Sequence, residues 1–473
     1  MKVKGWGAGA LAVLVGLLGF LLGAGQASAD GGPIGTDVHV AQTLGERELT
    51  VVIRRVTEVP GPLSVDVLTH AGTAPGKLEL AAVFGGTAFS RTQVDLGAAP
   101  GTYSGLLTVD QAGPWELAIG DGAQVARIPF VVPAQVPAPW EKAAYGGFVA
   151  AGALLLLALY AAVRARKSWH ALVPATGVVV ALAVAVTAAL LSSSIPPPAR
   201  DVLDPTVDSV NDPYALPPST MDTNRPPLNL AVSGTPAGFT LRLTDSATGR
   251  PADDLVVHHN ALVHLVAIGP SGQLWHLHPV RTAPGTYTAR FAAAEPGRYA
   301  LSAEVARRGG GTQLLRSILD VAGASGAPAP APGFGTQNVG GIPVTLTAGE
   351  IRANAATTMT ARFGDTATLQ PWLGMTGHLM VVGPLPDDGT PVGEAAATAP
   401  TWAHVHSMTG LPMMSGRSAA GQPDETVAAY GPEARFTFTF PAPGRYRLWF
   451  QGMRDYAVIT APAELVVPEG DRP

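Results

Sequence analysis

The chain has 473 residues, few charged side chains, a net charge of −5 and no cysteine. At roughly 150 residues per domain, this length predicts about three domains. The lack of cysteine excludes disulfide scaffolds, thiolate zinc sites, Cys nucleophiles and blue-copper electron-transfer centres. No Lys/Arg run is interleaved with aromatic residues, so we expect no nucleic-acid partner.

The first 29 residues have the composition of a secretory signal. Lys2 and Lys4 precede an apolar run, and Ala27-Ser-Ala29 forms a small-residue cleavage site before Asp30. We therefore expect residues 1–29 to be a signal peptide that is removed on export. An uncleaved anchor helix is the alternative.

Two further apolar segments, 143–163 and 171–191, are each long enough to cross a bilayer. The loop between them, 164–170, carries three Arg and Lys residues, and the positive-inside rule places such a loop in the cytoplasm. Neither segment contains an acidic residue or a histidine, so the pair is predicted to be an anchor and not an ion path. The regions on both sides of the hairpin would then lie outside the plasma membrane.

The rest of the chain has the patterns of β-strands. Runs such as Arg435-Phe-Thr-Phe-Thr-Phe440 alternate in polarity and are bounded by Gly, Pro, Asp and Asn. The predicted fold class is all-β, with three immunoglobulin-like or cupredoxin-like antiparallel sandwich domains plus the two-helix transmembrane hairpin. The predicted bounds are 30–138 for the first sandwich, 192–227 for a Pro-rich linker, 228–322 for the second sandwich, 323–341 for a Pro/Gly linker and 342–473 for the third sandwich.

An internal repeat joins these domains. Segments 99–103 and 283–287 both read Ala-Pro-Gly-Thr-Tyr, and each is followed by a Gly turn and a strand that opens with an aromatic residue. The third domain keeps the closing part only, at Gly444-Arg-Tyr446. An ungapped alignment places Thr92 and Val94 where the second domain has its His-x-His pair. The first domain therefore builds the module without histidines there.

The most informative pattern is a single histidine followed by His-x-His, which occurs in the second and in the third domain. The candidate metal ligands in these two copies are His264, His276 and His278, and His378, His404 and His406. Residues i and i+2 of a strand share a face, so each His-x-His pair presents two imidazoles side by side. Paired imidazoles of this kind most often bind a metal ion.

Each candidate has a structural alternative. In the second domain Trp275 and Leu277 would face the core, while His276 and His278 would point outward or into a cleft. His264 is as well explained as a half-buried histidine bonded to backbone. The pair His258-His259 supplies plausible additional ligands.

The third domain adds sulfur, because seven of the nine methionines fall within it. Met380 lies within a strand and is predicted to fill the core. Met408, Met413 and Met414 lie on a Gly- and Pro-containing loop near His404 and are candidate ligands. A thioether-imidazole set suits Cu(I), whereas imidazoles alone suit Cu(II) or Zn(II), so copper is the expected metal, with zinc second.

The segments 369–382, 404–406 and 440–451 resemble a bacterial family of exported β-sandwich proteins with a Gly-His-Leu strand, a downstream His-x-His-Pro and a closing Pro-Gly-Arg-Tyr hairpin. The second domain matches the same pattern, and together the matches cover much of 228–468. They are also similar to YtkA-like and FixH-like envelope domains, which often accompany copper handling. The resemblance implies a membrane-tethered, non-enzymatic envelope protein that handles metal.

The leading hypothesis is therefore a membrane-anchored extracytoplasmic protein that holds or delivers copper, with envelope copper-handling or other membrane proteins as partners. The competing hypothesis is a structural or protein-interaction module whose histidines organise loops. The single histidine and the His-x-His pair are 26 residues apart in the third domain (378 to 404) and 12 in the second (264 to 276), owing to an insertion at 384–400. We accordingly expect two separate and unequal sites, with the first domain acting as a spacer or docking module.

Overall fold

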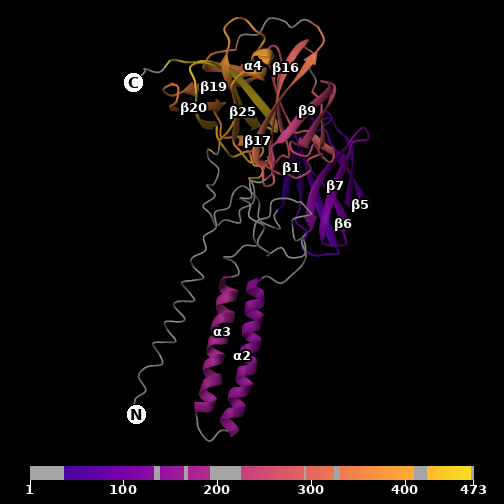
Figure 1. Cartoon of the computed structure of the whole chain (residues 1–473), viewed down its shortest axis with the longest axis vertical. Coiled ribbons are helices and arrows are strands. Elements are labelled where there is room, and N and C mark those ends of the chain that lie inside the picture. Colours follow the sequence, from indigo (N-terminus) through magenta and orange to yellow (C-terminus); the bar gives the residue numbers. More distant parts are fainter. Residues whose placement is uncertain are drawn as a thin grey trace.

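The computed structural model describes residues 37–132, 139–164, 169–191, 225–291, 295–323, 331–407, 409 and 423–469. The predicted signal peptide, most of the first linker and the loop residues Met408, Met413 and Met414 lie outside this described part. Three antiparallel sandwiches are stacked at one end, and two apolar helices extend from them (Figure 1). The predicted fold class is confirmed.

The two helices form an antiparallel hairpin. They are α2 (Pro139–Arg164) and α3 (Trp169–Leu191), and both are long and apolar enough to cross a membrane. A Cβ atom added to Gly147 would lie only 2.8 Å from the Ala185 Cβ, so the glycine allows α2 to pack closely against α3 at this point. Most of the remaining hairpin surface is uncovered, as expected for helices that face lipid.

The first sandwich packs two four-stranded sheets on a Val- and Leu-rich core, with the orders β1-β2-β3-β6 and β5-β4-β7-β8. Its strands are β1 (Val38–Leu44), β2 (Arg47–Ile53), β3 (Gly61–Thr69), β4 (Gly76–Phe84), β5 (Thr87–Leu96), β6 (Gly101–Val109), β7 (Gly113–Gly120) and β8 (Val125–Val132). Strand β7 shows why the sequence folds this way, since its alternate residues are buried along the whole strand.

The second sandwich has the sheet orders β14-β15-β10-β9 and β11-β16-β12-β13, with β17 added beside β16. Its strands are β9 (Leu228–Thr235), β10 (Gly238–Asp245), β11 (Leu255–Val256), β12 (His264–Ile268), β13 (Leu274–Leu277), β14 (Val280–Ala283), β15 (Thr286–Ala289), β16 (Gly297–Arg307) and β17 (Gly311–Val321).

The third sandwich repeats this plan with the orders β18-β19-β20-β24 and β21-β25-β22-β23, and β26 pairs with β25. Its elements are β18 (Gly335–Val339), β19 (Ile342–Ala348), β20 (Ala356–Phe363), β21 (Leu369–Gln370), β22 (Gly377–Leu385), α4 (Val392–Thr398), β23 (Thr401–Ser407), β24 (Glu433–Thr439), β25 (Gly444–Arg454) and β26 (Ala457–Val467). Strand β18 begins inside the predicted linker 323–341, because a Gly-Gly turn at 340–341 folds it back onto β19 as a hairpin.

One sheet has the same strand order in all three sandwiches, as the internal repeat predicted. The corresponding orders are β5-β4-β7-β8, β13-β12-β16-β17 and β23-β22-β25-β26. The ungapped alignment placed Val94 at the position of His278, and this is wrong by one residue. The Val94 side chain points into the core of the first sandwich. The exposed residues Arg91 and Gln93 occupy the face that His276 and His278 occupy in the second sandwich. A β-bulge between β4 and β5 shifts the register. The first sandwich still carries no histidine on this face.

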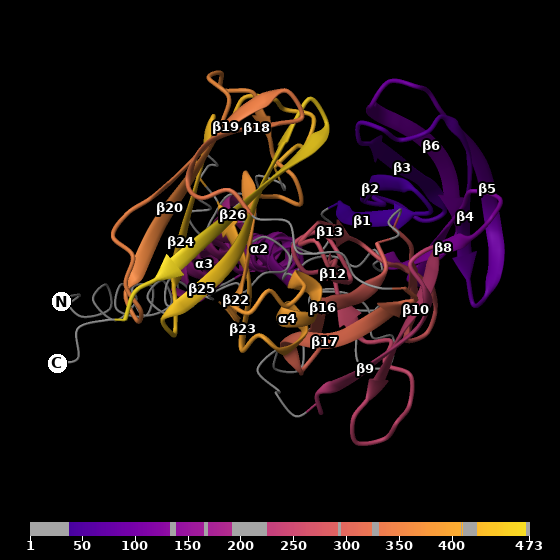
Figure 2. The same cartoon turned by 90° about the horizontal axis from the view of Figure 1, so that it is seen from above.

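The second and third sandwiches face each other through these repeated sheets (Figure 2). Strand β12 and most of β22 are buried on both faces, because one face packs in its own core and the other packs against the neighbouring sandwich. This is why both strands read as continuous apolar runs and not as an alternating pattern. Helix α4, formed by the insertion at 384–400, packs into the same interface.

Candidate metal centre

The six predicted histidines lie on equivalent strands of the two facing sheets. His264 opens β12 and His378 lies in β22, while the two His-x-His pairs lie on β13 and its end and on β23. His276 is opposite Val266 and His404 is opposite Met380, so each pairs with the residue two places after the single histidine. The strand register is therefore identical in both copies.

The expectation of unequal geometry is not met in the strands. The additional residues of the third sandwich form a loop and α4 between β22 and β23, and they leave the paired strands unchanged. Val392 of α4 donates its backbone N–H to the Pro270 carbonyl of the second sandwich at 2.8 Å. The insertion thus contributes to the contact between the sandwiches and not to the spacing of the histidines.

Each copy forms a compact triad. The nearest ring nitrogens within each triad all lie within 4.8 Å of one another, and the two sets are His264, His276 and His278, and His378, His404 and His406. The triads are also neighbours. The ring centroids of His276 and His404 are 5.1 Å apart, and those of His264 and His404 are 5.5 Å apart. The structure forms the two predicted groups of three histidines, and the interface places them side by side in one cluster.

The two single histidines are oriented in the same way. His264 Nε2–H donates to the carbonyl of His258 at 2.9 Å, and His378 Nε2–H donates to the carbonyl of Trp372 at 3.0 Å. In each case the acceptor is six residues earlier in the chain. A carbonyl only accepts hydrogen bonds, so Nε2 carries the proton and the Nδ1 lone pair of the neutral ring points into the cluster.

The first histidine of each His-x-His pair is held by the opposite sandwich. His276 Nδ1 lies 3.0 Å from Gln451 Oε1 of the third sandwich, and His404 Nδ1 lies 3.1 Å from Glu304 Oε2 of the second. Gln451 and Glu304 are the strand partners of the two single histidines, so they occupy equivalent positions. Metal-binding histidines commonly donate their second ring N–H to such acceptors.

The first sandwich also reaches the cluster, through Glu48 on β2. The Glu48 carboxylate accepts a hydrogen bond from His278 Nδ1, while Thr43 Oγ1 donates to its other oxygen at 2.7 Å. Burial raises the pKa of Glu48, but His278, His70 and Thr43 more than offset this effect and lower it. Instead of being only a spacer, the first sandwich supplies a carboxylate to the site.

The hydrogen bonds leave nitrogen lone pairs facing each other. His378 Nδ1 is 3.0 Å from His404 Nε2, and His264 Nδ1 is 3.4 Å from His276 Nε2. The outer N–H of each of these neutral rings is directed at an oxygen, so neither nitrogen of a facing pair has a proton to share. Two nitrogens on one tetrahedral ion, at about 2.0 to 2.1 Å each, are roughly 3.3 to 3.4 Å apart. The spacing fits a shared cation.

The environment keeps these rings neutral. Burial lowers the pKa of His264, His378 and His404 well below the ordinary value of 6.5, and repulsion from neighbouring histidines lowers it further. The same effects lower the pKa of His276 to about 3. The rings are therefore unprotonated at neutral pH, which is the form that binds metal.

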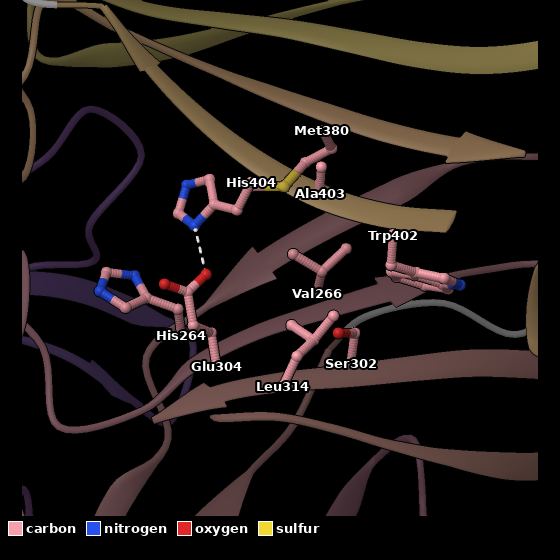
Figure 3. Close-up of a pocket in the computed structure, with 9 residues that line it drawn as sticks. All are labelled: His264, Val266, Ser302, Glu304, Leu314, Met380, Trp402, Ala403 and His404. Carbon is pink, nitrogen blue, oxygen red and sulfur yellow. Dashed lines mark hydrogen bonds and ion pairs between the residues drawn. The ribbon is translucent and has the colours of Figure 1, made fainter. Parts of the chain in front are cut away.

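A narrow cleft lies beside the cluster, between the second and third sandwiches. His264, Glu304 and His404 line its polar end, and Met380 and Trp402 belong to its largely apolar wall (Figure 3). Met380 is 3% exposed and packs between the sandwiches, where it fills core space as predicted. Tertiary structure thus adds Glu48, Glu304 and Gln451 to the site. No sequence motif marks any of these three residues.

Comparison with known proteins relates the third sandwich to one protein family. Residues 337–469 match the model of a family described as a domain of unknown function, DUF8832, which covers the third sandwich and its triad. A search of the curated proteins finds no match.

Similar solved structures include a tetra-tandem repeat from the extending region of a large adhesion protein (9% identity, 91% of this chain and 74% of that chain, TM-score 0.15). Another is the native conformation of E. coli alpha-2-macroglobulin (8% identity, 93% and 23%, TM-score 0.18). A third is a putative membrane anchored protein from Corynebacterium diphtheriae (8% identity, 90% and 93%, TM-score 0.14). TM-scores this low carry no functional inference.

Proposed function

We propose that this chain is a membrane-anchored metal-binding protein of the cell envelope, which holds or delivers copper through the two histidine triads. The convergence of six imidazoles, with the nitrogens of each triad within 4.8 Å of one another, carries this proposal. Histidines that served only to organise loops would have no reason to turn lone pairs toward one another in a buried interface.

Copper remains the leading metal, with zinc second. The described ligands are imidazoles with nearby carboxylates, a set that suits Cu(II) and Zn(II). The candidate ligands Met408, Met413 and Met414 follow His406 within eight residues of chain, and their thioethers would add affinity for Cu(I). A site with both ligand types would suit copper in either oxidation state.

The proposed location is supported by the helical hairpin. Its connecting loop carries three Arg and Lys residues, so the positive-inside rule places the loop in the cytoplasm and all three sandwiches outside the plasma membrane. This arrangement agrees with the predicted signal peptide and with the resemblance to YtkA-like and FixH-like envelope domains. The site would then sit close to the membrane, where membrane proteins that handle copper could exchange the ion with it.

The test is the metal content of the full chain, expressed with copper and purified in detergent. We expect stoichiometric copper in the natural chain and its near-complete loss in a His276→Ala, His404→Ala double variant. His39→Asn, which removes a histidine of the first sandwich far from both triads in sequence, should keep the metal. Absence of tight copper and zinc in the natural chain, or full metal content in the double variant, would overturn the proposal.

A second function is favoured by one observation. The bonds from His276 to Gln451, His404 to Glu304 and His278 to Glu48 each join two different sandwiches. The histidines could therefore serve to fix the sandwiches into one binding surface for another envelope protein. In that case the double variant would change the protein's thermal stability, and the natural chain would hold no metal.

A further inference from the structure

We propose a third metal site, formed by His258, His259 and Glu304 at the edge of the two triads, that binds a divalent cation such as Cu(II) or Zn(II). This inference rests on the proposed function, since it adds a third ion to the same cluster. The nearest side-chain nitrogens and oxygens of these three residues lie within 4.8 Å of one another. His258 Nε2 is 3.6 Å from Glu304 Oε1.

A tight turn presents the two imidazoles. The backbones of His258 and Ala261 exchange two hydrogen bonds, at 2.9 and 3.0 Å. His259 and Asn260, between them, both have positive φ values, 46° and 61°. Two consecutive residues in this region are typical of a type I′ turn, which normally selects Gly, Asn or Asp. In this conformation the ring of His259 lies against the ring of His258, with the two centroids 3.8 Å apart.

The third sandwich contains the same turn without the ligands. Trp372 and Met375 exchange the same two backbone bonds, and the intervening Leu373 and Gly374 have φ values of 54° and 77°. In both sandwiches the first turn residue accepts the hydrogen bond from the single histidine. The fold therefore builds this turn equally well from Trp and Leu, so the two histidines of the second sandwich are not needed for its shape.

The two sandwiches differ at a third position near the turn, in the strand beside the single histidine. The strand position occupied by Glu304 in the second sandwich is occupied by Gln451 in the third. Both side chains support a histidine of the opposite triad, for which a neutral amide oxygen is sufficient. The second sandwich thus has His, His and Glu where the third has Trp, Leu and Gln. All three differences add groups that bind divalent cations.

Glu304 is placed to serve two sites at once. Its Oε2 atom accepts the hydrogen bond from His404 Nδ1 at 3.1 Å, while Oε1 faces His258. The ring centroids of His259 and of His406, in the third-sandwich triad, are 4.2 Å apart. A cation held by Oε1 and the two turn histidines would adjoin that triad through a shared carboxylate. Binding at one of these sites should therefore change the affinity of the other, by the same factor in both directions.

The third site is also the more accessible one. The side chains of His258 and Glu304 are 14% and 15% exposed, against 4% for His404. Glu304 lines the cleft between the sandwiches (Figure 3). All three ligands of this site are partly exposed, whereas each triad contains a buried histidine. An ion here should therefore exchange faster than the ions in the triads. This is the behaviour expected of the position where metal enters and leaves the cluster.

Equilibrium dialysis of the full chain in detergent against buffered Cu(II) tests the proposal. We expect three copper ions per chain, one of which is removed by EDTA well before the other two. Glu304→Gln should reduce the content to two, because the amide still accepts from His404, as Gln451 does from His276, but offers no anionic ligand. His258→Ala combined with His259→Asn should give the same loss, since Asn tolerates the turn conformation.

The outcomes separate this inference from the proposed function. Two ions in the natural chain, or three ions retained in both variants, would overturn the third site and leave the triads intact. No tightly bound copper in the natural chain would overturn both. The variant Gln337→Glu serves as a control: it adds a carboxylate to the third sandwich at a glutamine whose side chain donates to the Pro462 carbonyl, outside the histidine cluster, and should leave the count at three.

Discussion

The second and third sandwiches present the same backbone to each other but differ in what they place on it. Both have the single histidine, the His-x-His pair in the same register, and a turn whose first carbonyl orients the single histidine. The third sandwich fills its turn with Trp372 and Leu373, which pack against Met453 in a small core with the first sandwich. The second uses His258 and His259. One copy of the turn packs apolar side chains, whereas the other presents two imidazoles.

The comparison also shows how the site depends on assembly. Each sandwich supplies three imidazoles and also the acceptor that orients an imidazole of its neighbour. Neither half is complete alone, because an unsupported buried ring would lose its fixed tautomer and orientation. The interface is therefore part of the site and not only a contact between domains.

The largest expected effect comes from the single histidines. His264→Ala and His378→Ala should each abolish tight binding in their own triad and leave an ion in the other, since each triad has its own three nitrogens. Copper content by mass spectrometry and the electron paramagnetic resonance spectrum of the Cu(II) form would measure this. Loss of all metal in either variant would show that the triads bind only as a unit, and would contradict the prediction that each triad binds its own ion.

The two turns should respond differently to glycine. Leu373 is 1% exposed and also has a positive φ. Leu373→Gly should lower the free energy of unfolding by about 1 to 4 kcal/mol, because the cavity it leaves costs more than the relief of backbone strain returns. His259 is half-buried and has a positive φ. His259→Gly should change the free energy of unfolding by less than about 1 kcal/mol, because relief of backbone strain offsets the lost ring contacts. Chemical denaturation of the metal-free protein would measure both changes.

The supporting residues should act across the interface. Gln451→Ala should weaken metal binding in the second-sandwich triad by roughly 10- to 100-fold, because His276 loses the acceptor that orients it. Competition with a chelator of known affinity would measure the loss. Gln337→Ala is a control, since the side chain of this glutamine donates to the Pro462 carbonyl and lies on β18, in the other sheet of the third sandwich. An effect confined to the third-sandwich triad would contradict the crossed arrangement.

Acid should destabilise the metal-free protein. The pKa values of His264, His276, His378 and His404 lie below the ordinary 6.5, so below that pH the unfolded chain binds more protons than the folded one. Stability should be full above about pH 6.5 and fall on acidification, with each ring contributing up to about 1.4 kcal/mol per pH unit. Denaturation at pH 7.5 and 5.5 would measure the loss. His264→Asn should reduce it, whereas a pH-independent stability would contradict the burial of neutral rings.

Much of the fold was predictable from the sequence because its signals are local. Alternating burial in β7, glycine turns and two long apolar segments specify strands and helices from neighbouring residues alone. The predicted bounds and registers of individual strands were less accurate. Strand β18 was predicted as linker because Gly and Pro around it suggested a loop, although its Gly-Gly turn closes a hairpin. The first-sandwich alignment failed by one residue at a β-bulge, which no local pattern revealed.

The sequence by itself determined the two histidine motifs, the all-β class and the apolar hairpin, since each of these depends on the spacing of residues along one strand or helix. Only the tertiary structure decided that the motifs form one cluster. That outcome depends on two sheets packing face to face, and it adds Glu48, Glu304 and Gln451 from three different sandwiches. Contacts between residues a hundred or more positions apart leave no periodic trace in a single chain.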